Sequence, residues 1–261
     1  MNNTSGVILN PSQNPINEPA FALQCKQVLD TNGVLVLKDF LSDKALALIR
    51  SDGLNNREQA YYTSGTHNVY LSPTDDKYTD QHPRNRAVTS SKGCITTDQI
   101  PTDSVLHTLY QDEKFKSFLC AVLNEKELYE YADNLSSINL HYASEGQELG
   151  WHFDNSSFAI TLLIEKPEAG GVFEFVKDAR DADKNNMNYE LVGDVLDKKV
   201  KASQLEMNAG DLVLFRGRNS MHRVTPTVGN TIRMLVVLAY NTKPGISLSQ
   251  SARQTFYGRL S

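Results

Sequence analysis

The chain has 261 residues, of which 40% are hydrophobic and 22% charged, and 26 basic against 31 acidic side chains give a formal net charge of −5. This composition is that of a globular protein with enough apolar residues for a core, and it excludes a disordered or collagen-like chain. The acidic balance argues against nucleic-acid binding, and no apolar stretch approaches the ~18 residues of a membrane span.

The start of the sequence and its cysteines favour an intracellular protein. The start, MNNTSGVILNPSQNPINEP, has neither the basic beginning nor the apolar centre of a signal peptide. Cys25, Cys94 and Cys120 are odd in number and form no C-x-x-C pair, so we expect reduced thiols. We therefore predict a cytoplasmic protein with no membrane and no nucleic-acid partner, and these features also allow a homodimer.

The first half of the chain is expected to be mainly helical. Residues 1–18, rich in Asn, Pro and Ser, predict a surface tail. A short strand is expected over 34–40, and residues 53–100 are polar and turn-rich, which is typical of a substrate-facing loop or of a solvated surface excursion. Helical spacing of apolar residues predicts three further segments: 19–29, 42–49 and 103–128.

The second half is expected to be β-rich. After residue 135 come the runs SINLHYAS, SFAITLLIE, GGVFEFV, DLVLFRG and IRMLVVLAY, separated by Gly, Pro, Asn and Asp. Many short strands in a stretch of roughly 100 residues predict a sandwich or a jelly roll. Residues 178–190 are charged and predict a loop or a small inserted helix.

Two histidines and one aspartate have the spacing of metal ligands. Residues i and i+2 of a strand point to the same face, so His152 and Asp154 can converge on one ion. His222 precedes the last long strand and could supply a second imidazole. Two imidazoles and one carboxylate on one face of ferrous iron leave three coordination positions open. The alternative is that His152 caps a turn and Asp154 forms an Asx-turn.

Arg233 adds weight to the metal interpretation. It lies eleven residues after His222, within the apolar run NTIRMLVVLAY. Burying an arginine is costly unless a carboxylate pairs with it. The partner could be a structural Asp or Glu, or the distal carboxylate of a dicarboxylic co-substrate held by the guanidinium fork.

This combined pattern resembles the signature of non-haem iron, 2-oxoglutarate-dependent dioxygenases. The resemblance covers residues 139–241 and includes the GDLVLF run before His222. It implies an α+β fold whose core is a double-stranded β-helix, the jelly roll of cupins, with flanking N-terminal helices. It also implies that His152, Asp154 and His222 bind Fe(II), with 2-oxoglutarate and O2 as co-substrates. Arg233 would then bind 2-oxoglutarate.

Two more residues are assigned to 2-oxoglutarate by the same resemblance. Tyr142 lies ten positions before His152, like a tyrosine that hydrogen-bonds the co-substrate in prolyl-hydroxylase-like relatives, and Thr231 precedes Arg233 in its strand. His141 alternates with Tyr142 and is expected to face the other side of its strand as a structural residue.

A narrower resemblance is to enzymes that halogenate or hydroxylate free amino acids, lysine prominent among them. It is carried by HFDNSSFAITLLIE, GRNSMHRVTP and KPGISLSQSARQTFYGRL. In the halogenating members the ligand carboxylate is replaced by Gly, which leaves a position for chloride. This chain keeps Asp154, so the resemblance implies hydroxylation of a small-molecule amino acid.

The same group implies four substrate contacts. Asn155 follows the ligand Asp154, Arg84 and Arg86 match a loop arginine that holds the amino-acid carboxylate, and Tyr257 matches an aromatic residue of a covering tail. Surface arginines and an ordinary packing role for Tyr257 are equally consistent with the sequence. Glu145 and Glu148 are open to either a substrate ammonium or solvent.

We accordingly predict one domain over residues 1–261. Its expected parts are a tail (1–18), mainly helical support with a substrate loop (19–130), a jelly-roll core (135–241) and a C-terminal lid (242–261). Three other functions stay open at this point. The first is a dioxygenase acting on a peptide or protein side chain or another metabolite. The second is a non-catalytic, cupin-like metal-binding module. The third is a zinc hydrolase, which leaves Arg233 unexplained.

Overall fold

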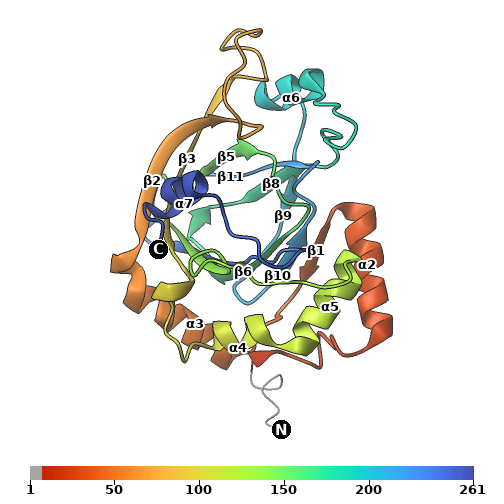
Figure 1. Cartoon of the computed structure of the whole chain (residues 1–261), viewed down its shortest axis with the longest axis vertical. Helices are drawn as coiled ribbons and strands as arrows, with labels where there is room; N and C mark the ends of the chain where they lie inside the picture. The colour runs from red at the N-terminus through yellow and green to blue at the C-terminus, as the bar shows by residue number, and fades with distance from the viewer. Residues whose placement is uncertain (1–7) are drawn as a thin grey trace.

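The computed structural model describes residues 8–261, and helices cover one side of a curled sheet (Figure 1). Neighbouring helices pack on one another, and α2 and α3 also contact strands of the sheet. The covering helices are α2 (Pro19–Asn32), α3 (Asp43–Asn56), α4 (Val105–Gln111) and α5 (Glu113–Leu123), with short 3-10 turns at Arg57–Gln59 and Thr97–Gln99. Within residues 8–261, none of the helices has the length and apolar character to cross a membrane.

Local sequence signals explain where these helices begin and end. Pro19 occupies the first turn of α2, where its missing N–H costs nothing, and Gly33 ends the helix with φ of 73°. Ser42 caps α3 by accepting a hydrogen bond from the N–H of Ala45 at 3.2 Å. The predicted helical region 103–128 is divided in two because the side chain of Asp112 caps the start of α5.

Eleven strands form the main sheet, and a short pair lies apart from it. The order is β1-β10-β6-β13-β4-β3-β5-β11-β8-β9, with β2 paired to β3, and β7 pairs only with β12. The strands are β1 (Val34–Leu37), β2 (Tyr61–Asn68), β3 (Ala87–Ile95), β4 (Ile138–Ala143), β5 (Leu149–His152), β6 (Ala159–Glu165), β7 (Ala169–Gly170), β8 (Phe173–Val176), β9 (Ser203–Leu205), β10 (Leu212–Phe215), β11 (Met221–Val224), β12 (Thr227–Val228) and β13 (Arg233–Leu238).

The sheet curls into the predicted jelly roll, so it has a face toward the helices and a face toward its own interior (Figure 1). Strand β13 shows the division, because Met234, Val236 and Leu238 belong to the core cluster shared with the helices. Leu235 belongs to a separate cluster on the other face. Alternation along the strand therefore places Arg233 on the interior face with Leu235.

The polar stretch 53–100 was expected to be irregular, and this expectation is wrong for much of it. Strands β2 and β3 form a long antiparallel pair, and β3 also pairs with β4. The strands were hidden because one face of this pair is polar or open to solvent, which removes the alternation of apolar residues. The charged stretch 178–190 is mainly irregular and leads into helix α6 (Tyr189–Leu196).

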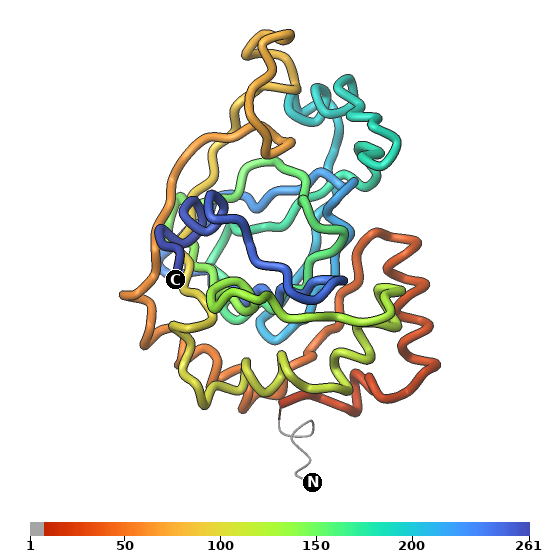
Figure 2. Tube along the Cα trace, viewed as in Figure 1, coloured from red at the N-terminus to blue at the C-terminus, as the bar shows by residue number. Residues whose placement is uncertain are grey.

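The sequence predicted a surface tail at the start of the chain and a lid at its end, and the described parts of both segments pack on the domain. Ile8, Leu9 and Ile16 are buried in the main core, so the described part of the predicted tail packs on the domain. Residues 1–7 lie outside the described residues. At the other end, helix α7 (Gln250–Tyr257) packs on β2 and β3, and the segment leading to it crosses the curled sheet in the view of Figure 2.

Candidate active site

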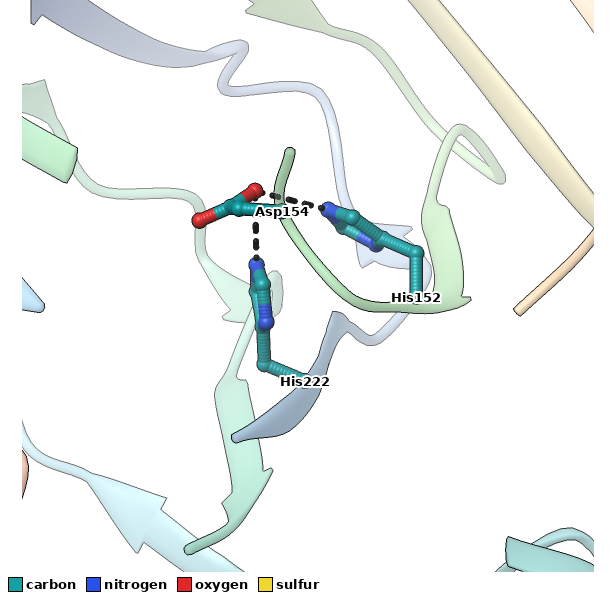
Figure 3. Close-up of side chains that lie close together, drawn as sticks. All are labelled: His152, Asp154 and His222. Carbon is teal, nitrogen blue, oxygen red and sulfur yellow. Dashed lines mark ion pairs between the residues drawn. The ribbon is translucent and has the colours of Figure 1, made fainter. Parts of the chain in front are cut away.

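Two strands bring the three predicted metal ligands together. His152 ends β5 and lies directly opposite His222 of β11, and their ring centroids are 4.2 Å apart. Asp154 follows β5 by two residues, and its Oδ1 lies 3.8 Å from Nε2 of His152 and 3.5 Å from Nε2 of His222 (Figure 3). One ligand atom from each residue lies within 4.8 Å of the others. The three side chains therefore converge on one point, as the sequence predicted.

Hydrogen bonds orient both imidazoles toward that point. Nδ1 of His152 lies 2.8 Å from the carbonyl oxygen of Gly150, and Nδ1 of His222 lies 3.0 Å from that of Ser220. A carbonyl oxygen can only accept, so each Nδ1 carries a proton, and in the neutral ring this leaves the lone pair on Nε2. This tautomer is the one that a metal requires.

The protonation states and an unsatisfied oxygen also fit a cation. Burial, with His222 close by, lowers the pKa of His152 to about 3, so this imidazole is neutral near pH 7. Burial opposes ionisation of Asp154, but its interactions with the two histidines and Arg180 outweigh burial and leave the pKa of Asp154 below its usual value. Its Oδ2 is buried and has no hydrogen-bond partner among residues 8–261. An ionised carboxylate with a free buried oxygen beside two imidazoles fits a divalent metal.

Gly217, which the sequence interpretation missed, makes room for this carboxylate. A Cβ atom built on Gly217 would lie 1.8 Å from Oδ2 of Asp154. The N–H of Asp154 also donates to the carbonyl oxygen of Gly217 at 3.1 Å. The only signal in the sequence is the position of Gly217, two residues after the end of β10, which does not by itself indicate such a close approach.

A cavity of about 280 Å³ connects the metal ligands with Arg233. The Phe173 ring stacks on His222 at a centroid distance of 5.5 Å, and the Phe215 ring meets it edge-to-face at 4.8 Å. Both rings form part of an apolar wall. Such a wall excludes water from the reaction site.

Arg233 lies on this wall as a buried cation. It is 6% exposed and forms no ion pair within the described part of the chain. Burial lowers its pKa to about 10, so the guanidinium is charged at neutral pH. The structural Asp or Glu that could have paired with Arg233 is therefore not found among residues 8–261. A cavity with a metal triad and an unpaired guanidinium is arranged for an anionic co-substrate.

Tyr142 was expected to face the co-substrate and His141 to face away from it, but the two side chains point in the opposite directions. Tyr142 is fully buried in the core between sheet and helices, and its hydroxyl donates to the carbonyl oxygen of Gly53 at 2.6 Å. His141 lines the cavity instead. The register explains both, because Arg233 pairs with Ala143 and therefore shares a face with His141 and not with Tyr142.

Thr231 is also displaced from the co-substrate role that the resemblance implied. Its hydroxyl donates to Oε1 of Glu168 at 3.2 Å in the turn before β13, and it does not line the cavity. The turn places Thr231 outside the sheet, whereas the strand carries Arg233 inward.

The two loop arginines do not line the cavity. Arg86 pairs with Asp197, with Nη1 and Oδ1 2.6 Å apart, and so attaches the loop to the end of α6. Arg84 donates from Nη2 to the carbonyl oxygen of Pro73 at 2.9 Å, and its guanidinium lies 6.0 Å from the centre of the Tyr70 ring. Both contacts support loop packing. Nη1 of Arg84 is buried and has no hydrogen-bond partner among residues 8–261, so a substrate role for Arg84 stays a prediction.

The other two substrate candidates, Asn155 and Tyr257, differ in their exposure to solvent. Asn155 is exposed directly after Asp154, and its role stays a prediction. Tyr257 is buried, and its hydroxyl donates to Oδ1 of Asn139 at 2.8 Å, so it anchors α7. The neighbouring Phe256 is 44% exposed, and its ring centre lies 6.0 Å from Nζ of Lys92, a residue of the cavity wall.

Solved structures with the same architecture define the class of the fold. An oxidoreductase of the 2OG-Fe(II) oxygenase family from Burkholderia pseudomallei is similar over 87% of this chain and 93% of its own, with a TM-score of 0.55 and 13% identity. The epimerase SnoN from nogalamycin biosynthesis, in complex with Fe3+ and alpha ketoglutarate, is similar over 85% of this chain and 84% of its own, with a TM-score of 0.56 and 10% identity. A prolyl hydroxylase from Trichoplax adhaerens covers 88% and 93%, with a TM-score of 0.53 and 14% identity.

The sequence itself defines the family. The halogenase D family matches residues 20–256, nearly the whole chain, and the chain belongs to this family. Comparison with curated proteins gives no significant match. Family, fold and metal triad together make the protein an enzyme of the 2-oxoglutarate-dependent oxygenase superfamily, with Fe(II) as its metal and 2-oxoglutarate and O2 as co-substrates.

Proposed function

We propose that the protein hydroxylates an unactivated C–H bond of a free amino acid, most simply a basic one such as lysine. The co-substrate 2-oxoglutarate and O2 would be converted to succinate and CO2, and the second oxygen atom would enter the product. The observation that carries the proposal is the complete ligand set in one cavity with an unpaired Arg233.

The roles of the chain's own groups follow from their positions. His152, His222 and Asp154 would hold Fe(II), which supplies the oxidising chemistry when 2-oxoglutarate and O2 are bound. Arg233 would pair with the distal carboxylate of 2-oxoglutarate and fix its orientation relative to the triad. The apolar wall that includes Phe173 and Phe215 would keep water away from the reacting atoms.

Hydroxylation is proposed in preference to halogenation because of Asp154. In the halogenating members of the group that this chain resembles, the ligand carboxylate is replaced by Gly, which leaves room for chloride at the metal. Here the carboxylate occupies that side of the site, and Gly217 leaves the space that it fills. An anionic oxygen ligand therefore stands where a halide would bind.

A small substrate is favoured by the size of the cavity. A volume of about 280 Å³ lies near the lower end of ordinary small-molecule sites, and α7 packs on the neighbouring strands β2 and β3. We also propose that the single domain acts in the cytoplasm without a nucleic-acid or membrane partner. The free thiols of Cys25, Cys94 and Cys120 are consistent with a reducing compartment.

A screen for succinate release tests the proposal. Protein purified without oxygen would receive Fe(II), 2-oxoglutarate, chloride and each free amino acid in turn, and O2 would start the reaction. We expect succinate above the uncoupled background with one amino acid, and a product heavier by one oxygen atom. A chlorinated product would refute the inference from Asp154. Turnover only with peptides would refute the substrate class but not the oxygenase assignment.

A further inference from the structure

The cavity wall carries a second buried cation besides Arg233. Lys92 of β3 and His141 of β4 line the same cavity as the metal triad. The order β13-β4-β3 makes their strands neighbours of the strand that carries Arg233. His141 pairs with Cys94 on one side and Leu235 on the other, so all three basic side chains share the interior face.

No acidic side chain in the described part of the chain forms an ion pair with either cation, Lys92 or Arg233. Burial lowers the pKa of Lys92, and the charge of Asp154 opposes this effect only in part. Among residues 8–261, Asp154 is the one acid that lines the cavity, and it belongs to the metal triad. Glu148 borders a smaller adjoining pocket and contacts neither cation through its carboxylate. Two buried charges without a counter-ion are costly unless a ligand supplies one.

His141 is placed to orient Lys92. Nζ of Lys92 lies 3.1 Å from Nε2 and 3.3 Å from Nδ1 of the ring. Burial and the neighbouring charges of Lys92 and Arg233 lower the pKa of His141 well below its usual value, so a neutral imidazole accepts one hydrogen bond from the ammonium. An ammonium has three donors. The remaining two have no acceptor within residues 8–261.

We propose that Lys92, positioned by His141, binds a carboxylate in the cavity beside the site of Arg233. The inference rests on the proposed function, because that function brings two carboxylates into the cavity. One is the distal carboxylate of 2-oxoglutarate, which Lys92 would share with Arg233. The other is the α-carboxylate of the amino-acid substrate, which Lys92 would hold alone. Either carboxylate would supply the missing counter-charge and the missing acceptors.

Lys92→Met tests the inference, since Met keeps the apolar body of the side chain and removes the charge. Dissociation constants for 2-oxoglutarate and L-lysine would be measured by calorimetry on the oxygen-free Fe(II) protein. Two probes that lack the relevant charge, 2-oxovalerate and L-lysinamide, would be titrated in parallel. A charge-assisted hydrogen bond in a buried site predicts at least about tenfold weaker binding of one carboxylate ligand.

The two sources of the carboxylate give different results. Weaker binding of 2-oxoglutarate with unchanged 2-oxovalerate identifies the co-substrate. Weaker binding of L-lysine with unchanged L-lysinamide identifies the substrate. The inference is overturned if two results occur together. The first is a dissociation constant of Lys92→Met for 2-oxoglutarate within threefold of that of the wild type. The second is that L-lysine binds both proteins equally well or binds neither of them.

Further variants exclude a merely structural role. Lys92→Arg should restore most of the affinity, whereas His141→Leu should reproduce part of the loss by releasing Lys92. Lys116→Met, which removes a lysine paired with Glu113 far from the cavity wall, serves as the matched control. Lys92→Met should also unfold in urea no earlier than the wild type, since it removes an unpaired buried charge. Failure of the proposed function would be visible separately in the succinate-release screen, because the wild type would then form no succinate above background with any free amino acid.

Discussion

Replacing Arg233 by Gln should weaken 2-oxoglutarate binding and leave iron binding nearly intact. Arg233 is 6% exposed and its guanidinium has no carboxylate partner in the described residues, so a ligand carboxylate would meet a desolvated charge without displacing another acid. Losing one member of such a buried charged pair costs about 3 kcal/mol. The dissociation constant of 2-oxoglutarate should therefore rise roughly 100-fold.

The assay for Arg233→Gln is calorimetric titration of 2-oxoglutarate into oxygen-free Fe(II) protein, with a separate Fe(II) titration of the metal-free protein. Iron affinity should change less than about threefold, since Arg233 is not a member of the triad and lies on another strand. A 2-oxoglutarate affinity close to that of the wild type would refute the role of Arg233. An equal loss of iron affinity would show that the substitution disturbs the whole site.

Three further predictions concern residues around the site. Gly217→Ala should lower iron affinity roughly 10–100-fold in a metal titration, because its Cβ would displace the carboxylate of Asp154; unchanged affinity would contradict the close approach. Tyr142→Phe should lower the free energy of unfolding by about 1 kcal/mol in urea and leave the KM for 2-oxoglutarate unchanged, since its hydroxyl contacts Gly53 and not the cavity; a large rise in KM would restore it to the site. The low pKa of His141 means that the unfolded chain binds a proton that the folded chain does not, so stability should fall as pH drops below about 6.5. Urea unfolding would be measured at pH 7.5 and 5.5. Between these two pH values the free energy of unfolding of His141→Gln should fall by roughly 1 kcal/mol less than that of the wild type. Equal decreases would argue against a buried neutral His141.

The metal ligands could be predicted because their geometry is local. His152 and Asp154 are two residues apart at a strand end, and His222 lies opposite His152 on the strand that pairs with it. This spacing alone left a turn-cap role open, and Arg233 together with the family resemblance favoured the metal site. Arg233 could also be predicted from the sequence, because a cation inside a long apolar run is costly to bury without a partner.

The direction of Tyr142 could not be predicted in the same way. Both faces of β4 are buried, one by helices and the other by the cavity wall, so no apolar alternation indicates which residue faces inward. The register that pairs Leu235 with His141 decides the question, and it depends on contacts between distant parts of the chain. Lys92 was missed for a related reason, because its strand lies in a polar segment without periodicity.

The most direct test of the central claim compares iron-dependent succinate formation by the wild type and Asp154→Ala. Glu113→Gln, which alters an exposed acid on α5, is the control. Both variants should give the circular dichroism spectrum of the wild type. We predict that the wild type and the control form succinate with Fe(II), O2 and the amino acid found in the screen, and that Asp154→Ala loses more than about 100-fold in rate. Undiminished succinate formation by a folded Asp154→Ala protein would contradict the assignment of the metal site.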